Sequence, residues 1–257
     1  MTRGKGYLPD VEDVRDWKAF SPDPMAPRLA ASPLGAAAVQ DFGDLVQEVH
    51  DQGRTGSCVA QAGCSAAELW ARLRGVILPA LSRRAAYDWG RGGQLPLLDV
   101  GCTPRVAMQR WREWGFCSDE TWPWDEGAIN APLPLDVIEA GAHAKLVSYF
   151  RVDGAGDVRC AQVRWLLSEG YPVIFGQDCY EDLENYTGGV LPDVPAGAIL
   201  GGHMTTIVGY KPGSFRVLNS WGTGWGEDGF YRMSDARFGG DSVRDVYAFT
   251  CAPLRVA

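Results

Sequence analysis

The spacing of apolar residues changes once along this chain, and that change limits the folds it can adopt. In the first two thirds, apolar residues recur every three or four positions, as on one face of a helix. Three helices are predicted there, over 57–74, 103–115 and 157–170. Beyond these the period becomes two, in short β-branched or aromatic runs bounded by glycine or proline. Five strands are predicted, over 172–177, 204–210, 215–219, 229–233 and 245–250.

This separation of helices from strands predicts an α+β protein with a helical lobe, a sheet or barrel lobe and a cleft between them. The 257 residues are enough for one large domain or two closely packed lobes with a substantial core.

Charge and hydropathy exclude several classes of protein. With 24 basic and 32 acidic side chains, the net charge of -8 argues against binding nucleic acid without regard to sequence. The longest uncharged run, 194–210, is broken by proline, glycines and a histidine, so no membrane span is expected. Asp10, Glu12 and Asp13 stand where a signal peptide needs apolar residues. We therefore expect a soluble cytoplasmic protein that binds neither nucleic acid nor membranes.

The seven cysteines do not follow a metal-binding or disulfide pattern. They lie at positions 58, 64, 102, 117, 160, 179 and 251. No two form a Cys-x-x-Cys pair, which argues against a zinc site. An odd number without a signal peptide argues against a disulfide framework. We therefore expect free thiols and no metal.

Cys58 is the cysteine best placed for chemistry, because it stands at the start of the first predicted helix. The unpaired N–H groups and partial positive charge of a helix N-terminus favour a thiolate. Gly53 and Gly56, just before it, allow a substrate to approach the backbone closely. A small buried packing residue is the alternative interpretation. Cys64 and Cys160 lie inside predicted helices and are expected to be structural.

Three histidines are candidates for the base that a thiol nucleophile needs. His50 precedes the glycine-rich turn, and His143 lies in a polar, alanine-rich segment. His203 follows two glycines and opens a predicted strand, a position that suits a base facing a substrate. A histidine satisfied in the core or at its rim is the alternative for His203.

Asn219 ends the following predicted strand and precedes Ser220 and Trp221. An amide oxygen can accept the imidazole N–H and hold the ring in position without adding charge. Trp221 could cover that hydrogen bond from water. A simple turn residue is the other interpretation of Asn219.

Three segments that contain these residues resemble the signature blocks of papain-like cysteine peptidases. They are Gln52-Gly53-x-x-Gly56-Ser57-Cys58, Gly202-His203-x-x-x-Ile207-Val208-Gly209-Tyr210 and Asn219-Ser220-Trp221-Gly222-x-x-Trp225-Gly226-x-x-Gly229. They occur in the family's order, and His203 follows Cys58 at the family's separation of roughly 130–150 residues. The resemblance covers 51–249. It implies a papain-like fold with the active-site cleft between a helical lobe and an antiparallel, β-barrel-like lobe.

The resemblance implies a role for each matching residue. Cys58 would be the nucleophile, His203 the base and then the acid, and Asn219 the residue that orients the imidazole. Gln52 matches the glutamine that shares the oxyanion hole with the Cys58 backbone N–H. Trp221 matches the tryptophan that shields the histidine–asparagine pair.

On the substrate side, the resemblance implies two further residues and no cofactor. Gly101 would supply backbone for an extended peptide to pair with. Met204 matches a position that lines the main specificity pocket, and a methionine there predicts an apolar and adaptable pocket. The expected partner is a peptide or protein substrate, with no metal or organic cofactor.

Two positions depart from the family pattern. Thr55 replaces a cysteine that the family uses in a disulfide, so that bridge cannot form, in agreement with a reduced setting. Val59 replaces the usual tryptophan after the nucleophile, which affects local packing and not the chemistry. The chain is most similar in style to bacterial and phage-borne members that lack the usual prodomain.

The chain divides into three predicted parts. Residues 1–47 would form an N-terminal arm and the first barrel segment, with a first strand near 39–49. Residues 48–250 would be the catalytic domain, with a helical lobe over about 51–130 and a β lobe over about 131–250. Residues 251–257 would be a C-terminal tail. Because the arm is too short and too proline-rich for a helical prodomain, the full chain is expected to be active as synthesised. In a weaker role, residues 7–17 would pack along the lobes as a clasp.

The sequence therefore predicts a cysteine endopeptidase that works through a thioester acyl-enzyme on Cys58. An exopeptidase, deamidase or transpeptidase with the same triad is the first alternative. A peptide-binding module that has lost catalysis is the second, and the intact Cys58, His203, Asn219 and Gln52 disfavour it.

Overall fold

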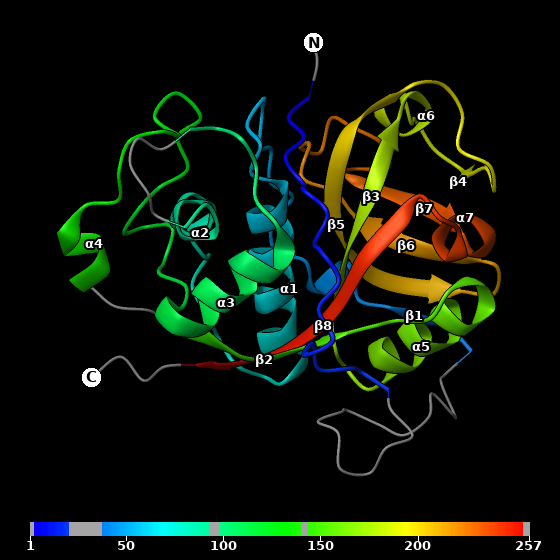
Figure 1. Cartoon of the computed structure of the whole chain (residues 1–257), viewed down its shortest axis with the longest axis horizontal. Coiled ribbons are helices and arrows are strands. Elements are labelled where there is room, and N and C mark those ends of the chain that lie inside the picture. Colours follow the sequence, from blue (N-terminus) through cyan, green and yellow to red (C-terminus); the bar gives the residue numbers. More distant parts are fainter. Residues whose placement is uncertain (1–2, 21–37, 93–97, 140–142, 254–257) are drawn as a thin grey trace.

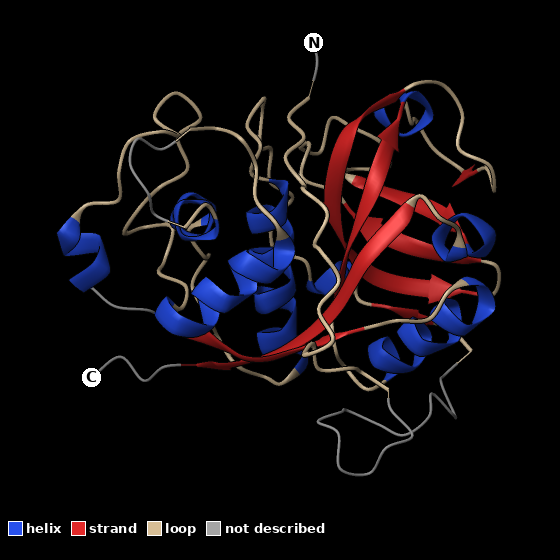
Figure 2. Cartoon of the chain, viewed as in Figure 1, coloured by secondary structure: helices blue, strands red, loops and turns tan. Residues whose placement is uncertain are grey.

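The structure, a computed structural model, describes residues 3–20, 38–92, 98–139 and 143–253. Its elements gather in two lobes that lie side by side (Figure 1). The helical lobe holds α1 (Cys58–Leu73), α2 (Arg83–Gly90), α3 (Pro104–Trp114) and α4 (Leu135–Glu139). The β lobe holds most of a twisted sheet together with α5 (Gly156–Ser168), α6 (Glu181–Glu184) and α7 (Asp235–Gly239), as Figure 2 shows. The predicted two-lobed α+β fold is confirmed.

The described strands form one sheet with the order β2-β8-β3-β5-β6-β7-β4, and β1 pairs with β5. The strands are β1 (Gln40–Asp41), β2 (Ala144–Arg151), β3 (Val173–Tyr180), β4 (Val190–Leu191), β5 (Ile199–Lys211), β6 (Ser214–Leu218), β7 (Phe230–Ser234) and β8 (Val243–Pro253). Their pairings are antiparallel except that of β4 with β7. β2 and β8 extend from the β lobe beneath the helical lobe (Figure 1), so both lobes rest on the same two strands.

Helix α1 fixes the helical lobe against the sheet. It is rich in alanine and also contains two cysteines and one glycine, and these small side chains let neighbouring elements approach closely. Thr206 of β5 donates its hydroxyl hydrogen to the carbonyl oxygen of Ala62, at 3.0 Å. At Gly63 the ring of Trp111 from α3 takes the place of a side chain, because a Cβ there would overlap it. The start of α1 is therefore held against the strand that carries His203.

The predicted helices and strands are all present with ends shifted by a few residues, but two substantial elements were not predicted. Helix α2 was not predicted because three of its buried residues are charged and interrupt the apolar spacing of a helix: Arg83, Arg84 and Asp88. Arg83 is neutralised there by Glu68 at 2.7 Å. Strand β2 was also missed. Of the strand expected near 39–49, only β1 and a short 3-10 turn, Gly43–Leu45, are present.

Two large apolar cores lie on either side of the cleft. The core of the helical lobe includes Ala144 and Leu146 of β2 and Phe249 and Cys251 of β8. Residues 251–253, expected in a tail, pair with β2 as part of β8, whereas 254–257 lie outside the described residues. All seven cysteines are within the described ranges, and each is buried and unpaired. Among the helices that the structure describes, none is both long and apolar enough to cross a membrane.

Candidate active site

The loop before α1 and the loop after β6 are hydrogen-bonded to each other. The Gln52 N–H donates to the Ser220 carbonyl and the Gly222 N–H donates to the His50 carbonyl, each at 2.9 Å. Gly53 takes a left-handed conformation, with φ 59°, as the chain turns towards Cys58, the first residue of α1. This pairing brings Cys58 of one lobe close to Asn219 and Trp221 of the other.

His203 and Asn219 form a buried pair on adjacent strands. His203 Nε2 lies 2.7 Å from Asn219 Oδ1, which also accepts the Ser220 N–H at 2.9 Å. Because that backbone donor identifies the asparagine atom as oxygen, Nε2 must carry the imidazole proton. Nδ1 then keeps its lone pair. It is buried and has no hydrogen-bond partner among the described residues. The imidazole is therefore set as a base whose free nitrogen is Nδ1.

Trp221 covers this pair. Its ring stacks on the His203 ring, with 4.5 Å between centroids and 22° between planes. Burial lowers the pKa of His203 from 6.5 to about 4, while the hydrogen bond to Asn219 acts in the opposite direction. His203 is consequently neutral at physiological pH, as a general base requires.

The side chain of Gln52 is fixed by hydrogen bonds at both ends of its amide. Its Oε1 accepts the Ser220 hydroxyl at 2.6 Å, which fixes the orientation of the amide. Nε2 donates to the carbonyl of Thr55 at 2.7 Å and to that of Gly4 at 3.2 Å. Sequence reasoning placed Ser220 in a signature block but missed this contact. A serine two residues after the end of β6 is too common a feature to single out by sequence.

The Cys58 thiol is completely buried. Burial raises its pKa to about 11, against the effect of nearby backbone groups of Met204, Gly6 and Val59. Met204 directly follows His203, so the thiol and the imidazole belong to one site. In this conformation the thiol is neutral and not the thiolate expected from the helix N-terminus alone.

The burial comes from the N-terminal arm, residues 3–20, which runs between the lobes (dark blue in Figure 1). The Gly4 N–H donates to the Gly53 carbonyl at 2.9 Å, on the helical lobe. The Tyr7 N–H donates to the Gly202 carbonyl at 3.2 Å, on the β lobe. The arm therefore bridges the two lobes close to Cys58 and His203.

On the helical side, Cys102 pairs with the arm. Its N–H donates to the Gly6 carbonyl at 2.9 Å, and its carbonyl accepts the Leu8 N–H at 3.2 Å. Gly101 lies next to it with φ 80°, and a Cβ on Gly101 would overlap the Gly6 carbonyl. The backbone that pairs with an extended chain thus belongs to Cys102, while the residue expected in that role, Gly101, permits the close approach.

A substrate cannot reach Cys58 while the arm is in place. This geometry disagrees with the expectation of a chain that is active as synthesised. That expectation considered only a helical prodomain, whereas an extended segment needs no helix to fill a cleft. The clasp expected over 7–17 agrees with the contacts that the arm makes with both lobes.

The other candidates lie outside this constellation. The side chain of His50 is 3.7 Å from Glu48, and burial lowers its pKa to about 3. His143 precedes β2 and donates its N–H to the Phe116 carbonyl. Within the described residues, no group of three or more His, Cys, Asp or Glu side chains is arranged to hold a metal ion.

The fold is similar to those of solved cysteine proteases. A cysteine protease of Xylella fastidiosa, xylellain, has the same fold: the TM-score is 0.81 at 24% identity, over 98% of this chain and 97% of that one. Bromelain of Ananas comosus, solved with the E64 inhibitor, matches with a TM-score of 0.66 at 22% identity, over 83% and 99% of the chains. The two-lobed fold is that of papain-like proteases.

The chain belongs to the papain family of cysteine proteases, whose family model matches residues 38–242. An uncharacterized peptidase C1-like protein of Acanthamoeba polyphaga mimivirus is 29% identical over 197 residues, 71% of this chain and 63% of the relative. Papain of Carica papaya is 27% identical over 216 residues, 82% of this chain and 58% of papain. The chain thus spans about three fifths of the length of these curated relatives.

Displacing the arm should expose Cys58. A Cβ on Gly6 would overlap the Gly56 carbonyl, so Gly6→Val cannot seat in the cleft. We expect a thiol-reactive probe to label Cys58 at least about tenfold faster in Gly6→Val than in the unaltered chain, measured by mass spectrometry of the labelled peptide. Gly224→Val is the control, because nothing lies within 4 Å of a Cβ there. Equal labelling of Gly6→Val and the unaltered chain would contradict the coverage of Cys58 by the arm.

The buried His203 should make stability depend on pH. Its pKa is lowered on folding, from 6.5 to about 4, so between these values the unfolded chain binds a proton that the folded chain does not. Stability is therefore lost as the pH falls through this window. From pH 7 to pH 4.5, the free energy of unfolding should fall by about 2–3 kcal/mol more in the unaltered chain than in His203→Gln. Denaturant titrations at the two pH values measure this difference, and equal losses would show that His203 is not buried neutral.

Proposed function

We propose that this chain is a cysteine endopeptidase whose nucleophile is Cys58. The observation that carries the proposal is the buried His203 Nδ1, which has no partner among the described residues while Nε2 is held by Asn219. An imidazole in this tautomer accepts a proton through Nδ1, and the thiol of Cys58 lies in the same site. Once the arm leaves, loss of the burial that raises the thiol pKa favours transfer of the proton.

In the proposed reaction the Cys58 proton passes to His203 Nδ1 as the sulfur attacks the peptide carbonyl carbon. Negative charge then develops on the carbonyl oxygen, where the Gln52 Nε2–H and the Cys58 backbone N–H stabilise it. His203 returns the proton to the leaving amine, and the C–N bond breaks to leave a thioester. A water molecule gives a proton to His203 and attacks the thioester, which releases the acid and restores the thiol.

The arm supports this assignment of Gln52. The Gly4 carbonyl already accepts from the Gln52 amide, at 3.2 Å, as the carbonyl of a bound peptide would. Since the arm is itself an extended peptide paired with the backbone of Gly202 and Cys102, the cleft suits a peptide substrate.

The course of the arm favours an endopeptidase over an exopeptidase. Residues 3–10 pass along the cleft and continue on the far side to Lys18, which pairs with Asp153. At the other end, beyond Trp221, the surface is hollowed by a depression of about 630 Å³, lined in part by Arg3, Trp124 and Gly222. A long chain can therefore lie across the reacting groups with both ends extending beyond them.

Peptide cleavage should require Cys58. In the Gly6→Val chain, we expect internal cleavage of a random peptide library, and adding Cys58→Ala should abolish it because a methyl group cannot attack a carbonyl. Mass spectra of the products measure both the rate and the position of cleavage. Cys64→Ala, a change in the same helix, is the matched control and should keep the activity. If Cys64→Ala loses activity while Cys58→Ala keeps it, the assignment of Cys58 as the nucleophile is wrong. Products that differ from the substrate by one or two terminal residues would indicate an exopeptidase.

Gln52 should act on the rate of acylation. Removing one donor from an oxyanion hole costs about 10²–10³ in rate, so Gln52→Ala in the Gly6→Val chain should slow acylation by that factor. Single-turnover release of an amine product measures it. Gln61→Ala alters another buried glutamine, a residue of α1 whose side chain bonds to Ser57, and should leave acylation close to its starting rate. An unchanged rate in Gln52→Ala would remove Gln52 from the oxyanion hole.

A further inference from the structure

The side chain of Tyr7 fills a pocket next to the reacting groups. Tyr7 is 3% exposed, and its ring lies where a side chain on Gly176 of β3 would otherwise be. On the opposite strand, Gly202 receives the Tyr7 N–H and also makes room for the ring. Met204 and Ile174 belong to the same buried cluster as Tyr7. The backbone of Tyr7 also lies against the Cys58 thiol, so this pocket opens beside Cys58.

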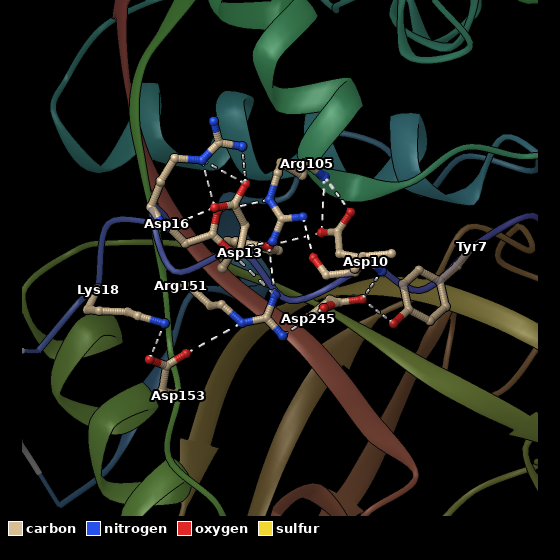
Figure 3. A network of polar contacts seen from close by, with 12 residues as sticks. Tyr7, Asp10, Asp13, Asp16, Lys18, Arg105, Arg151, Asp153 and Asp245 are labelled. Atoms are coloured by element: carbon tan, nitrogen blue, oxygen red, sulfur yellow. Dashed lines mark hydrogen bonds and ion pairs between the residues drawn. The ribbon is translucent and has the colours of Figure 1, made fainter.

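The far end of the pocket is closed by the carboxylate of Asp245, from β8. The Tyr7 hydroxyl donates to Asp245 Oδ2 at 2.6 Å, as Figure 3 shows. The same oxygen accepts the Asp10 N–H at 2.8 Å. Burial and this carboxylate raise the pKa of Tyr7 well above its usual range, so the phenol is a neutral donor. The pocket therefore ends in a hydrogen-bond acceptor and not in the apolar wall expected from Met204.

Asp245 is held rigidly in this position. It is 3% exposed, and its other oxygen, Oδ1, is paired with Arg151 at 3.0 Å. Its φ of 48° lies in the left-handed region, which strains any residue other than glycine. This strain is smallest for asparagine and aspartate. A strained, buried and fixed carboxylate at the end of a pocket is suited to recognise one kind of group.

Both donors to Asp245 Oδ2 belong to the arm, so the oxygen loses them when the arm leaves. An unsatisfied buried acceptor is costly, and a ligand that restores the hydrogen bond is favoured over one that does not. The side chain that enters this pocket in place of Tyr7 must therefore bring a donor to the same depth.

The charges around the pocket favour a neutral donor over a cation. Asp245 is already paired with Arg151, and Arg105 is held by Asp16 of the arm (Figure 3). When the arm leaves, it takes away Asp10 and Asp16 and leaves both arginines in place. No excess of negative charge then remains to offset the desolvation of a lysine or arginine side chain.

Building on the proposed peptidase function, we propose that Asp245 is a specificity-determining residue that selects substrates with a tyrosine in this pocket. A phenylalanine would leave the carboxylate oxygen without a donor, and a basic side chain would enter beside Arg151 and Arg105 with no excess negative charge to pair with. The arm, through Tyr7, occupies the pocket with the side chain that the pocket prefers.

Substrate competition tests this preference. Cleavage of a peptide library by the full-length Gly6→Val chain first identifies the position whose side chain governs the rate. Matched peptides with Tyr, Phe, Lys or Arg at that position are then compared by kcat/KM. We expect Tyr to exceed Phe by about 10- to 100-fold, the range for a hydrogen bond to a charged group, and to exceed Lys and Arg as well.

Two substitutions of Asp245 separate the carboxylate from the rest of the pocket. In Asp245→Gly, the glycine tolerates the left-handed backbone and the acceptor is removed. The ratio of kcat/KM for the Tyr peptide to that for the Phe peptide should therefore fall to about threefold or less. Asp245→Asn keeps a weaker acceptor and should give an intermediate ratio. Three results would overturn the proposal. The kcat/KM for the Tyr peptide could be less than threefold that for the Phe peptide when Asp245 is unaltered, Asp245→Gly could leave this ratio unchanged, or the Lys or Arg peptide could be preferred.

The arm provides a second readout that does not depend on peptide cleavage. In the chain with Gly6 intact, Tyr7→Phe removes only the hydroxyl and should speed labelling of Cys58 by about tenfold or more. In Asp245→Gly, the same change should have no further effect. Leu8→Ala alters an arm side chain that is 45% exposed and is the control. If no peptide is cleaved while this coupling between Tyr7 and Asp245 is present, the peptidase function fails and the recognition of phenol stands. If peptides are cleaved and the coupling is absent, the recognition fails alone.

Discussion

The site depends first on the backbone pairing between the loop before α1 and the loop after β6. Gln52 and Ser220 bond to each other through backbone and side chain, and the His50 carbonyl receives the Gly222 N–H. Cys58 and His203, the proposed nucleophile and base, belong to different lobes, so their relative position would otherwise depend on how the lobes pack. Because these bonds join the two loops directly, they fix the relative position of Cys58 and His203 locally. The lobes can then differ from those of other papain-family members without disturbing the distance between the reacting groups.

The arm occupies the features of the cleft that the proposed reaction assigns to a substrate. Its backbone pairs with Cys102 on one wall and Gly202 on the other, its Gly4 carbonyl meets Gln52, and Tyr7 fills the side-chain pocket. Beyond the cleft it is held by ion pairs, including that of Asp16 with Arg105. Glycine at positions 4 and 6 is what permits the close fit, since a Cβ at either would overlap the loop before Cys58. Residues that look like an irregular, acidic tail in the sequence therefore complete the interior of the folded chain.

The limits of sequence prediction follow from the range of the interactions involved. Cys58, His203, Asn219 and Gln52 could be identified because each sits in a local motif of glycines and a strand or helix end. The roles of Tyr7 and Asp245 could not, because the two residues are 238 positions apart and only the fold brings them together. Helix α2 was missed for a related reason. A charged residue such as Arg83 is expected at the surface, but its ion pair with Glu68 allows it to be buried. Occlusion of the cleft was missed because an extended segment leaves no periodic pattern.

The complete burial of Cys58 also has a chemical consequence for the resting protein. Oxidants such as peroxide attack the thiolate and need access to the sulfur, and a cysteine oxidised beyond the sulfenic acid is not recovered by thiols. With its pKa raised to about 11 and no exposed surface, the Cys58 sulfur is protonated and shielded. The other six cysteines are buried as well, so none presents an accessible thiol for disulfide exchange. While the arm is in place, the Cys58 sulfur is thus protected from oxidation, and removal of the arm would expose it to oxidants as well as to a substrate.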